Sequence, residues 1–150
     1  MHANQTEDLL IRQAQPGDWV AVEALLRASG LPLDGARDHL AHFLVGERGG
    51  TTVCAAGMER YGDVALLRSV VVAADARGLG YGERIARAVL QAAKRAGVRQ
   101  AVLLTTTAGP YFARRGFSEI PRGAAPAAVQ ASREFQGACP ASATVMAIHL

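Results

Sequence analysis

A glycine-rich segment, Arg77-Gly78-Leu79-Gly80-Tyr81-Gly82, has the residue types and spacing that point most directly to chemistry. The apolar run Val70-Val71-Val72 precedes it, and an amphipathic helical pattern over 83–96 follows it. A turn between a strand and a helix directs successive backbone N–H groups into one concavity, and the helix dipole adds partial positive charge there. Glycines also let the backbone approach phosphate oxygens closely. The segment therefore predicts a binding site for a pyrophosphate.

Two common phosphate-binding motifs do not fit this segment. The dinucleotide fingerprint G-x-G-x-x-G, started at Gly80, would need a glycine where the chain has Ile85. The P-loop of nucleotide triphosphatases would need a lysine after Gly82, and none follows it. A plain glycine turn is the alternative interpretation, but three alternating glycines after an arginine, at the end of an apolar strand, favour phosphate binding.

Histidines and cysteines give no metal site in this sequence. His39 and His42 lie three residues apart in a helical pattern, but two histidines without a third ligand are more typical of ordinary surface residues. His2 and His149 lie near the chain ends and carry no signal. Cys54 and Cys139 form no metal-spaced set, and we expect two free thiols that pack as small apolar residues. We predict that no metal is required.

The elements that position the glycine segment alternate between β and α patterns, as expected for a single α/β (α+β) domain over residues 1–150. Apolar and β-branched runs predict the strands, and apolar residues at helical spacing predict the helices. The predicted strands are 9–12, 51–60, 64–73, 101–106 and 144–149. The predicted helices are 19–28, 34–45, 83–96, 110–115 and 126–135. A hairpin turn at 61–63 joins the second strand to the third.

Composition and charge restrict the function classes. Half of the 150 residues are apolar, the net charge is +3, and Lys94 is the single lysine beside fifteen arginines. Because the arginines are scattered and no binding motif accompanies them, we expect a small polyanionic ligand rather than nucleic acid. No apolar run is long enough to cross a bilayer, and the first ten residues lack the pattern of a signal peptide. We therefore expect a cytoplasmic protein that does not bind membranes.

The glycine segment resembles the R/Q-x-x-G-x-G/A motif of the GCN5-related N-acetyltransferase (GNAT) superfamily. The order of elements is also similar, and Tyr111-Phe112-Ala113-Arg114-Arg115-Gly116-Phe117 resembles the "YxxxGF" region of that family. The resemblance covers residues 9 to 120. It implies the GNAT fold, with a mixed, mostly antiparallel central sheet flanked by helices and splayed at the acetyl-CoA site.

Four other segments resemble the acetyltransferase branch found in bacterial arsenic-resistance operons, and that branch is similar to amino-acid N-acetyltransferases such as N-acetylglutamate synthase. These segments are Glu59-Arg60-Tyr61-Gly62, Leu67-Arg68-Ser69, Leu104-Thr105-Thr106-Thr107 and Cys139-Pro140-Ala141-Ser142-Ala143.

The resemblance implies which residues bind acetyl-CoA. The backbone of the motif strand would pair with the pantetheine arm, the amides of the glycine segment would hold the pyrophosphate, and the thioester would lie between the motif strand and the strand at Ala101. The cofactor-binding residues are therefore predicted to be Val70, Val71, Val72, Arg77, Gly78, Leu79, Gly80, Tyr81, Gly82 and Phe112.

The sequence departs from the family at the general acid. Many members place a tyrosine four residues before the glycine of "GF", and this chain has Phe112 there. Tyr111 lies about 100° away around a helix, so it does not simply replace that tyrosine. A thiol of pKa about 8.5 leaves readily without an acid. We keep Tyr111 as the alternative acid and expect it mainly to pack or to contact substrate.

The acceptor amine needs a base, because an amine of pKa about 8 to 10 is mostly protonated at neutral pH. Glu59 is the best-placed carboxylate to act as this base, directly or through water. The alternative interpretation is that Glu59 is a solvated charge near the hairpin turn. Arg60 and Arg68 could clamp an acidic group of the acceptor. Arg68 is the stronger candidate, although an arginine in an apolar strand also suits a structural ion pair. The predicted acceptor site comprises Arg60, Arg68, Ser69, Thr105, Thr106 and Thr107.

These residues predict an acetyl-CoA-dependent N-acetyltransferase that acts on a small amino acid or an acidic analogue, with a role in arsenic resistance. Transfer of another acyl group or transfer to a protein amine is a second interpretation. An acyl-CoA-binding sensor without turnover is a third, which Phe112 leaves open. A homodimer is common in the family.

Overall fold

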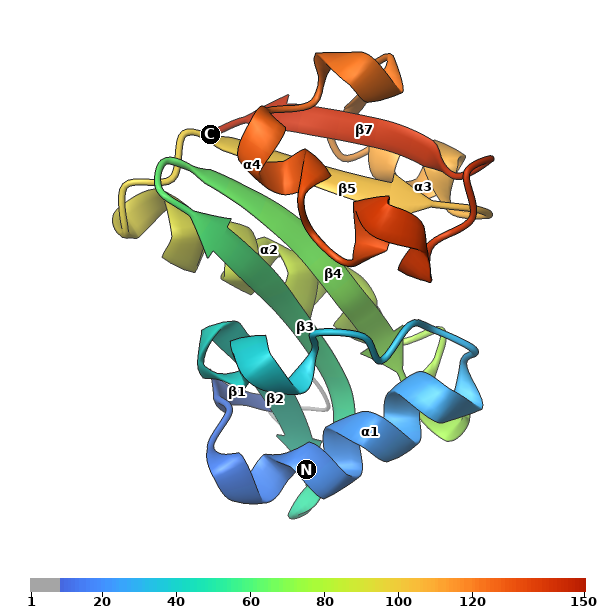
Figure 1. Cartoon of the computed structure of the whole chain (residues 1–150). Helices are drawn as coiled ribbons and strands as arrows, with labels where there is room; N and C mark the ends of the chain where they lie inside the picture. Colours follow the sequence, from blue (N-terminus) through green and yellow to red (C-terminus); the bar gives the residue numbers. More distant parts are fainter. Residues whose placement is uncertain (1–8) are drawn as a thin grey trace. The chain divides into compact units, whose positions relative to one another are not determined.

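The computed structural model describes residues 9–150, so His2 and the first part of the N-terminal segment lie outside the described residues. The chain forms two compact units. The first contains the residues up to Met58 together with Ser69–Val89, and the second contains Glu59–Arg68 and Leu90–Leu150. Strands β3 (Thr51–Tyr61) and β4 (Val64–Val72) each contribute residues to both units (Figure 1).

A seven-stranded mixed sheet with the order β1-β2-β3-β4-β5-β7-β6 runs through the fold. Besides β3 and β4, its strands are Leu9–Gln13 (β1), Phe43–Arg48 (β2), Gln100–Thr105 (β5), Ser118–Glu119 (β6) and Thr144–His149 (β7). Antiparallel ladders join β1 to β2, β2 to β3, β5 to β7 and β6 to β7. The β4–β5 ladder is parallel and pairs only Val64–Leu66 with Gln100–Val102. This mixed sheet flanked by helices confirms the predicted fold class.

Four α-helices accompany the sheet in the described part of the chain: Trp19–Ala28 (α1), Tyr81–Arg95 (α2), Gly109–Ala113 (α3) and Ala127–Gln130 (α4). Helix α1 has the predicted bounds, and α2 begins two residues before the predicted start. Its apolar stripe is buried as its periodicity predicts, with Ile85, Val89 and Ala93 all nearly inaccessible. Among residues 9–150, no helix has both the length and the apolar character needed to span a bilayer.

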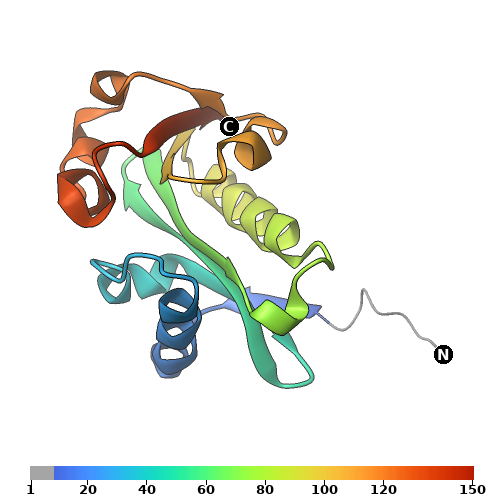
Figure 2. The same cartoon turned by 90° about the vertical axis from the view of Figure 1, so that its right-hand side faces the viewer.

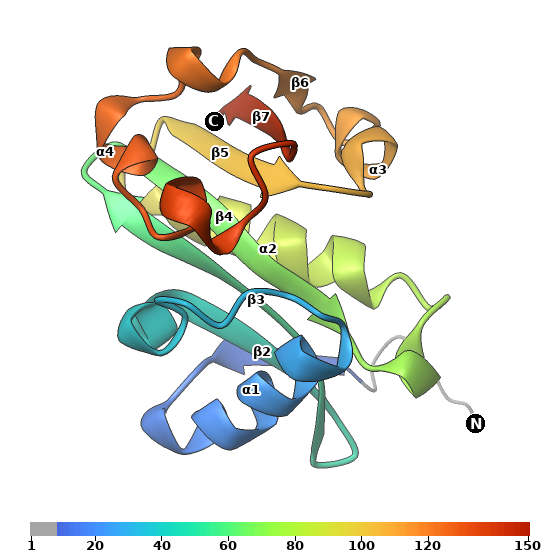
Figure 3. The ribbon, with the colours of Figure 1, turned by 45° about the vertical axis from the view of Figure 1, so that its right-hand side comes forward.

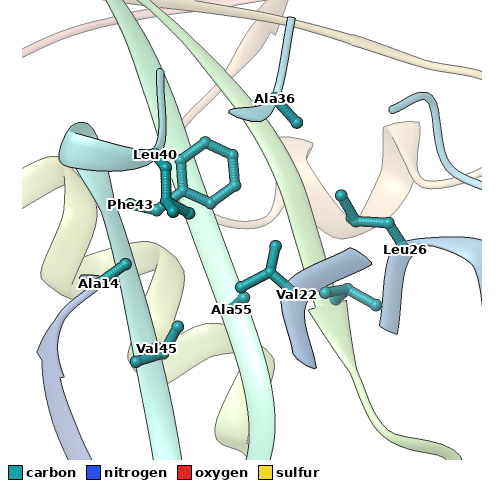
Figure 4. Close-up of a cluster of buried hydrophobic side chains, with 9 residues drawn as sticks. Ala14, Val22, Leu26, Ala36, Leu40, Phe43, Val45 and Ala55 are labelled. Atoms are coloured by element: carbon teal, nitrogen blue, oxygen red, sulfur yellow. The ribbon is translucent and has the colours of Figure 1, made fainter. Parts of the chain in front are cut away.

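The core of the first unit lies between α1 and strands β2 and β3. Figure 4 shows its buried side chains, among them Val22 and Leu26 from α1 and Phe43 and Val45 from β2. Strand β1 extends this part of the sheet along β2 (Figure 2).

Strand β2 corrects the sequence prediction, because the helix predicted over 34–45 is not present. A 3-10 helix over Arg37–His42 ends at β2 instead. The reason lies across the sheet: Phe43 pairs with Gly57, and a Cβ atom on Gly57 would stand only 2.1 Å from the phenyl ring. Since this space comes from a residue on another strand, local periodicity could not reveal it.

The second unit is built on the first half of β4 and on β5, β7 and β6. Between β6 and β7 the chain crosses one face of these strands (Figure 3), packing Val129 and Phe135 against Leu66 and Val102. The predicted helix over 126–135 is only partly present, as α4 followed by a π-helical turn over Glu134–Ala138. The helical course is broken at residues 131–133, and Gly137, with φ of 128°, lies inside the following turn.

Candidate functional site

The glycine loop leads directly into α2 with its backbone exposed. Gly78 and Gly80 have φ of 83° and 80°, a conformation that glycine adopts without steric cost. A Cβ atom at either position would meet no other atom within 4 Å, so this side of the loop is open. Leu79 between them is exposed as well. The loop therefore presents its backbone to the surroundings instead of burying it in the core.

The first turn of α2 adds hydrogen-bond donors beside the loop. The amide of Arg84 donates to the carbonyl of Gly80 at 3.1 Å, which makes Gly80 the residue that caps the helix. The amides of Tyr81, Gly82 and Glu83 consequently precede the first intrahelical bond of α2. Such amides, together with the positive end of the helix dipole, favour an anionic ligand.

Three arginines hold or surround this loop. The Arg77 side chain donates to the carbonyl of Val72 and to the hydroxyl of Ser29, both at 3.2 Å, and so ties the loop to the end of β4. The guanidinium carbons of Arg48 and Arg84 lie 5.8 and 6.0 Å from the centre of the buried Tyr81 ring. Sequence patterns did not single out Arg48, and they placed Arg84 only on the polar face of the helix. All three arginines bring positive charge to the glycine loop.

The end of β4 is the other part of the predicted acetyl-CoA site in the first unit. Val71 is buried, whereas Val70 and Val72 are half-buried, as expected from the alternation of a strand. Ser69 precedes them with φ of 62°, an uncommon conformation for a residue other than glycine. This residue interrupts the regular course of β4 directly before the three valines.

A buried cluster of charged groups lies in the second unit. Arg68 donates from Nη1 to Oε2 of Glu59 at 2.6 Å, and its Nη2 lies 3.4 Å from Oε2 of Glu134. The hydroxyl of Tyr61 donates to the other oxygen of Glu59. The Arg68 side chain is 0% exposed, and those of Glu59 and Glu134 are 2% and 5% exposed. We refer to Glu59, Tyr61, Arg68 and Glu134 as the buried charge cluster.

Electrostatics in this cluster follow from burial and from the two carboxylates. Burial, reinforced by the hydrogen bond to Glu59, raises the pKa of Tyr61 well above its usual value. Cys139 lies nearby, and burial, with the charge of Glu134 acting in the same direction, raises the pKa of its thiol to about 11. Both groups are therefore neutral at physiological pH. A buried carboxylate pair around a single guanidinium depends strongly on that guanidinium.

The contacts bear on the roles predicted for these residues. Glu59 is not a solvated hairpin charge, because it is buried and each of its oxygens accepts a hydrogen bond. The Arg68 guanidinium already bonds two carboxylates of the protein. Arg60 projects away from the cluster, as strand alternation requires, and donates to the carbonyls of Gly62 and Ala96 at 3.2 and 2.6 Å. The structure thus brings Glu59 and Arg68 together and places Arg60 at the end of α2.

The threonines at the end of β5 differ in exposure. Thr105 is half-buried, and its hydroxyl accepts a hydrogen bond from the amide of Ala108 at 2.9 Å. Thr106 and Thr107 are exposed. Helix α3 follows and presents Tyr111 and Phe112, whose rings lie edge to face at 5.0 Å.

Tyr111 is held by packing on α3. The guanidinium carbon of Arg115 lies 3.6 Å from the centre of the Tyr111 ring, and Arg115 also donates to the Tyr111 carbonyl at 2.9 Å. We predict that Tyr111→Phe keeps most of kcat at saturating acetyl-CoA, because the ring contacts do not need the hydroxyl. A pH–rate profile of the variant checks this. A fall of about a hundredfold with loss of the alkaline limb would instead identify Tyr111 as the general acid.

The histidines and cysteines of the described residues form no metal site. Within residues 9–150, no three His, Cys, Asp or Glu side chains gather as metal ligands would. Cys54 and Cys139 are both buried free thiols, which confirms that expectation. Burial also raises the pKa of Cys54, to about 11, so this thiol is unreactive at neutral pH.

Comparison with known proteins identifies relatives of the chain. Residues 39–119 match the model of the acetyltransferase (GNAT) domain. Amino-acid acetyltransferases from Neisseria meningitidis serogroups A and B are each 30% identical over 116 residues, which is 71% of this chain and 27% of theirs. The chain thus spans about a quarter of the length of these curated relatives.

Solved structures share the fold. N-acetylglutamate synthase from Neisseria gonorrhoeae, in complex with coenzyme A and N-acetyl-glutamate, is similar over 100% of this chain and 36% of its own, with a TM-score of 0.83 and 24% identity. A Mycobacterium tuberculosis protein in complex with CoA is similar over 94% of this chain and 99% of its own, with a TM-score of 0.76 and 21% identity.

Proposed function

Because the chain belongs to the acetyltransferase (GNAT) domain family, we propose that it transfers an acetyl group from acetyl-CoA to the amine of a small amino acid. The observation that carries this proposal is the open glycine loop joined to the first turn of α2. Exposed backbone at Gly78 and Gly80, the amides at the start of α2 and three nearby arginines together suit the pyrophosphate of a coenzyme A ester.

The proposed reaction joins the amine nitrogen of the acceptor to the acetyl carbonyl carbon and breaks the carbon–sulfur bond of the thioester. The amine loses a proton, and the departing thiolate takes one up. Amides at the end of β4 would align the pantetheine arm beside Val70 and Val72. Glu59 remains the proposed base, and its contacts restrict that role: the proton would have to reach a remaining lone pair of an oxygen that already accepts from Tyr61 or Arg68.

An acidic amino acid, or an analogue that carries a phosphinate or arsinate, is the acceptor class that we propose. The names of the curated relatives support an amino acid, and the resemblance of four segments to acetyltransferases of arsenic-resistance operons is the reason for proposing the analogue. Within this proposal, Arg68 acts as a positioning residue that holds Glu59 and Glu134, since its guanidinium is already bonded to both. A homodimer stays a prediction.

An acceptor panel tests the proposed function. Purified protein and acetyl-CoA are incubated with neutral amino acids, glutamate, its phosphinate and arsinate analogues, and polyamines, and release of the free thiol is followed. We expect the acidic amino acids to give the highest kcat/KM. Turnover with polyamines alone would contradict an anionic acceptor. Binding of acetyl-CoA without turnover on any amine would favour the sensor interpretation.

A further inference from the structure

Arg122 lies in a 3-10 turn over Arg122–Ala124, in the segment that crosses the sheet face of the second unit between β6 and β7. Its guanidinium carbon lies 5.0 Å from the centre of the Phe135 ring, and Nη2 donates to the Phe135 carbonyl at 3.2 Å. One edge of this guanidinium is therefore fixed by stacking and by a hydrogen bond. Within residues 9–150, no carboxylate pairs with the Arg122 side chain.

The second terminal nitrogen of Arg122 is different. Nη1 is buried, and no group among residues 9–150 accepts a hydrogen bond from it. A buried cationic donor without an acceptor costs folding free energy, so native proteins seldom keep one that has no role. Arg122 as a whole is half-buried, although Nη1 itself is covered by the protein in this structure.

Charges around Arg122 indicate which ligand would suit it. Arg122 lies beside the buried charge cluster, because the carbonyl that it bonds belongs to Phe135, the residue directly after Glu134. Inside the cluster, both carboxylates are directed to Arg68. Arg122 therefore has one charged donor nitrogen, Nη1, without an acceptor, and such a donor suits a carboxylate, phosphinate or arsinate oxygen.

We infer that Arg122 binds the side-chain anion of the acceptor and so determines the preference for acidic over neutral amino acids. This inference rests on the proposed function. Nη1 would supply the new hydrogen bond while Nη2 stays on the Phe135 carbonyl, and the groups that cover Nη1 would have to move aside to admit the anion. Sequence patterns gave no reason to choose Arg122 among fifteen arginines, because the open donor becomes visible only in the folded segment.

Paired kinetics with an acidic and a neutral acceptor test this inference. Arg122→Met keeps apolar contact with Phe135 and removes the donors, and Arg122→Lys keeps the charge but not the planar edge. We expect Arg122→Met to lower kcat/KM for L-glutamate by roughly tenfold to a hundredfold, the loss of one charged hydrogen bond, and to leave L-norvaline nearly unchanged. Arg122→Lys should fall between. The exposed Arg133 on the same segment provides the control, and Arg133→Met should affect neither acceptor.

Equal losses for both acceptors, or no loss for either, would overturn the inference. Glutarate, which has two carboxylates and no amine, provides a readout that does not need turnover. Calorimetric titration of glutarate in the presence of CoA should show weaker binding to Arg122→Met than to the unmodified protein. If no amino acid is acetylated, the proposed function fails, and this titration still decides the inference: unchanged affinity overturns it.

Discussion

Replacing Arg68 with methionine should lower the melting temperature by roughly 6 to 20 °C. The substitution leaves Glu59 and Glu134 buried without their shared cation, and removing one partner of a buried ion pair typically costs about 3–5 kcal/mol. In a domain of this size each kcal/mol corresponds to roughly 2–4 °C. Thermal unfolding followed by circular dichroism measures the change.

Two further variants make the Arg68 result specific. Arg87→Met removes the exposed pair with Glu83, and it should scarcely change the melting temperature because surface pairs contribute little. The triple variant Arg68→Met, Glu59→Gln, Glu134→Gln should have a higher melting temperature than Arg68→Met alone, because it leaves no unpaired charge buried in the cluster. An unchanged melting temperature combined with a raised KM for the acceptor would show instead that Arg68 binds the substrate directly.

Gly80→Val should weaken acetyl-CoA binding by about a hundredfold or more. Gly80 has φ of 80°, which a β-branched residue strongly resists, and its missing side chain leaves open the side of the loop where phosphate oxygens would approach. Losing two hydrogen bonds to a charged group accounts for a change of this size. Calorimetric titration with acetyl-CoA measures it.

Gly62→Val provides a matched control for Gly80→Val. Gly62 lies in the turn between β3 and β4 with φ of 69°, and a Cβ atom there also meets no neighbour within 4 Å. The two variants therefore carry a similar backbone strain at different places. We expect Gly62→Val to keep the acetyl-CoA affinity of the unmodified protein. If the dissociation constants of Gly62→Val and Gly80→Val were the same, the glycine loop would be only a turn and would not bind the cofactor.

The sequence predicted the elements whose signals are local. Helix α2 carries its apolar stripe and the preceding glycines within one continuous segment, so its position and its role beside the loop could be inferred together. The strand preceding the loop was also predicted, because its run of β-branched residues is typical of a buried strand. For these parts of the fold, neighbouring residues contain the whole signal.

Features that depend on distant residues could not be predicted in this way. Strand β2 is set by the space that Gly57 leaves for Phe43 across the sheet. The buried charge cluster needs Glu134, which is far from Arg68 in the chain and enters through an irregular turn. The position of Arg68 in an apolar strand predicted that it needs an anionic partner. Which carboxylates serve as that partner is visible only in the folded chain.

Transfer of a labelled acetyl group tests the central claim most directly. Acetyl-CoA labelled with ¹³C at the acetyl carbonyl is mixed with the protein and L-glutamate, and the carbonyl signal is followed by NMR, with a sample without protein as the control and Gly80→Val as a variant expected to transfer the label more slowly. We predict that the thioester signal is replaced by that of an amide on the α-nitrogen of the acceptor, at a rate that depends on the unmodified protein. Label that stays in the thioester, or that appears as free acetate whether or not the amino acid is present, would contradict this account.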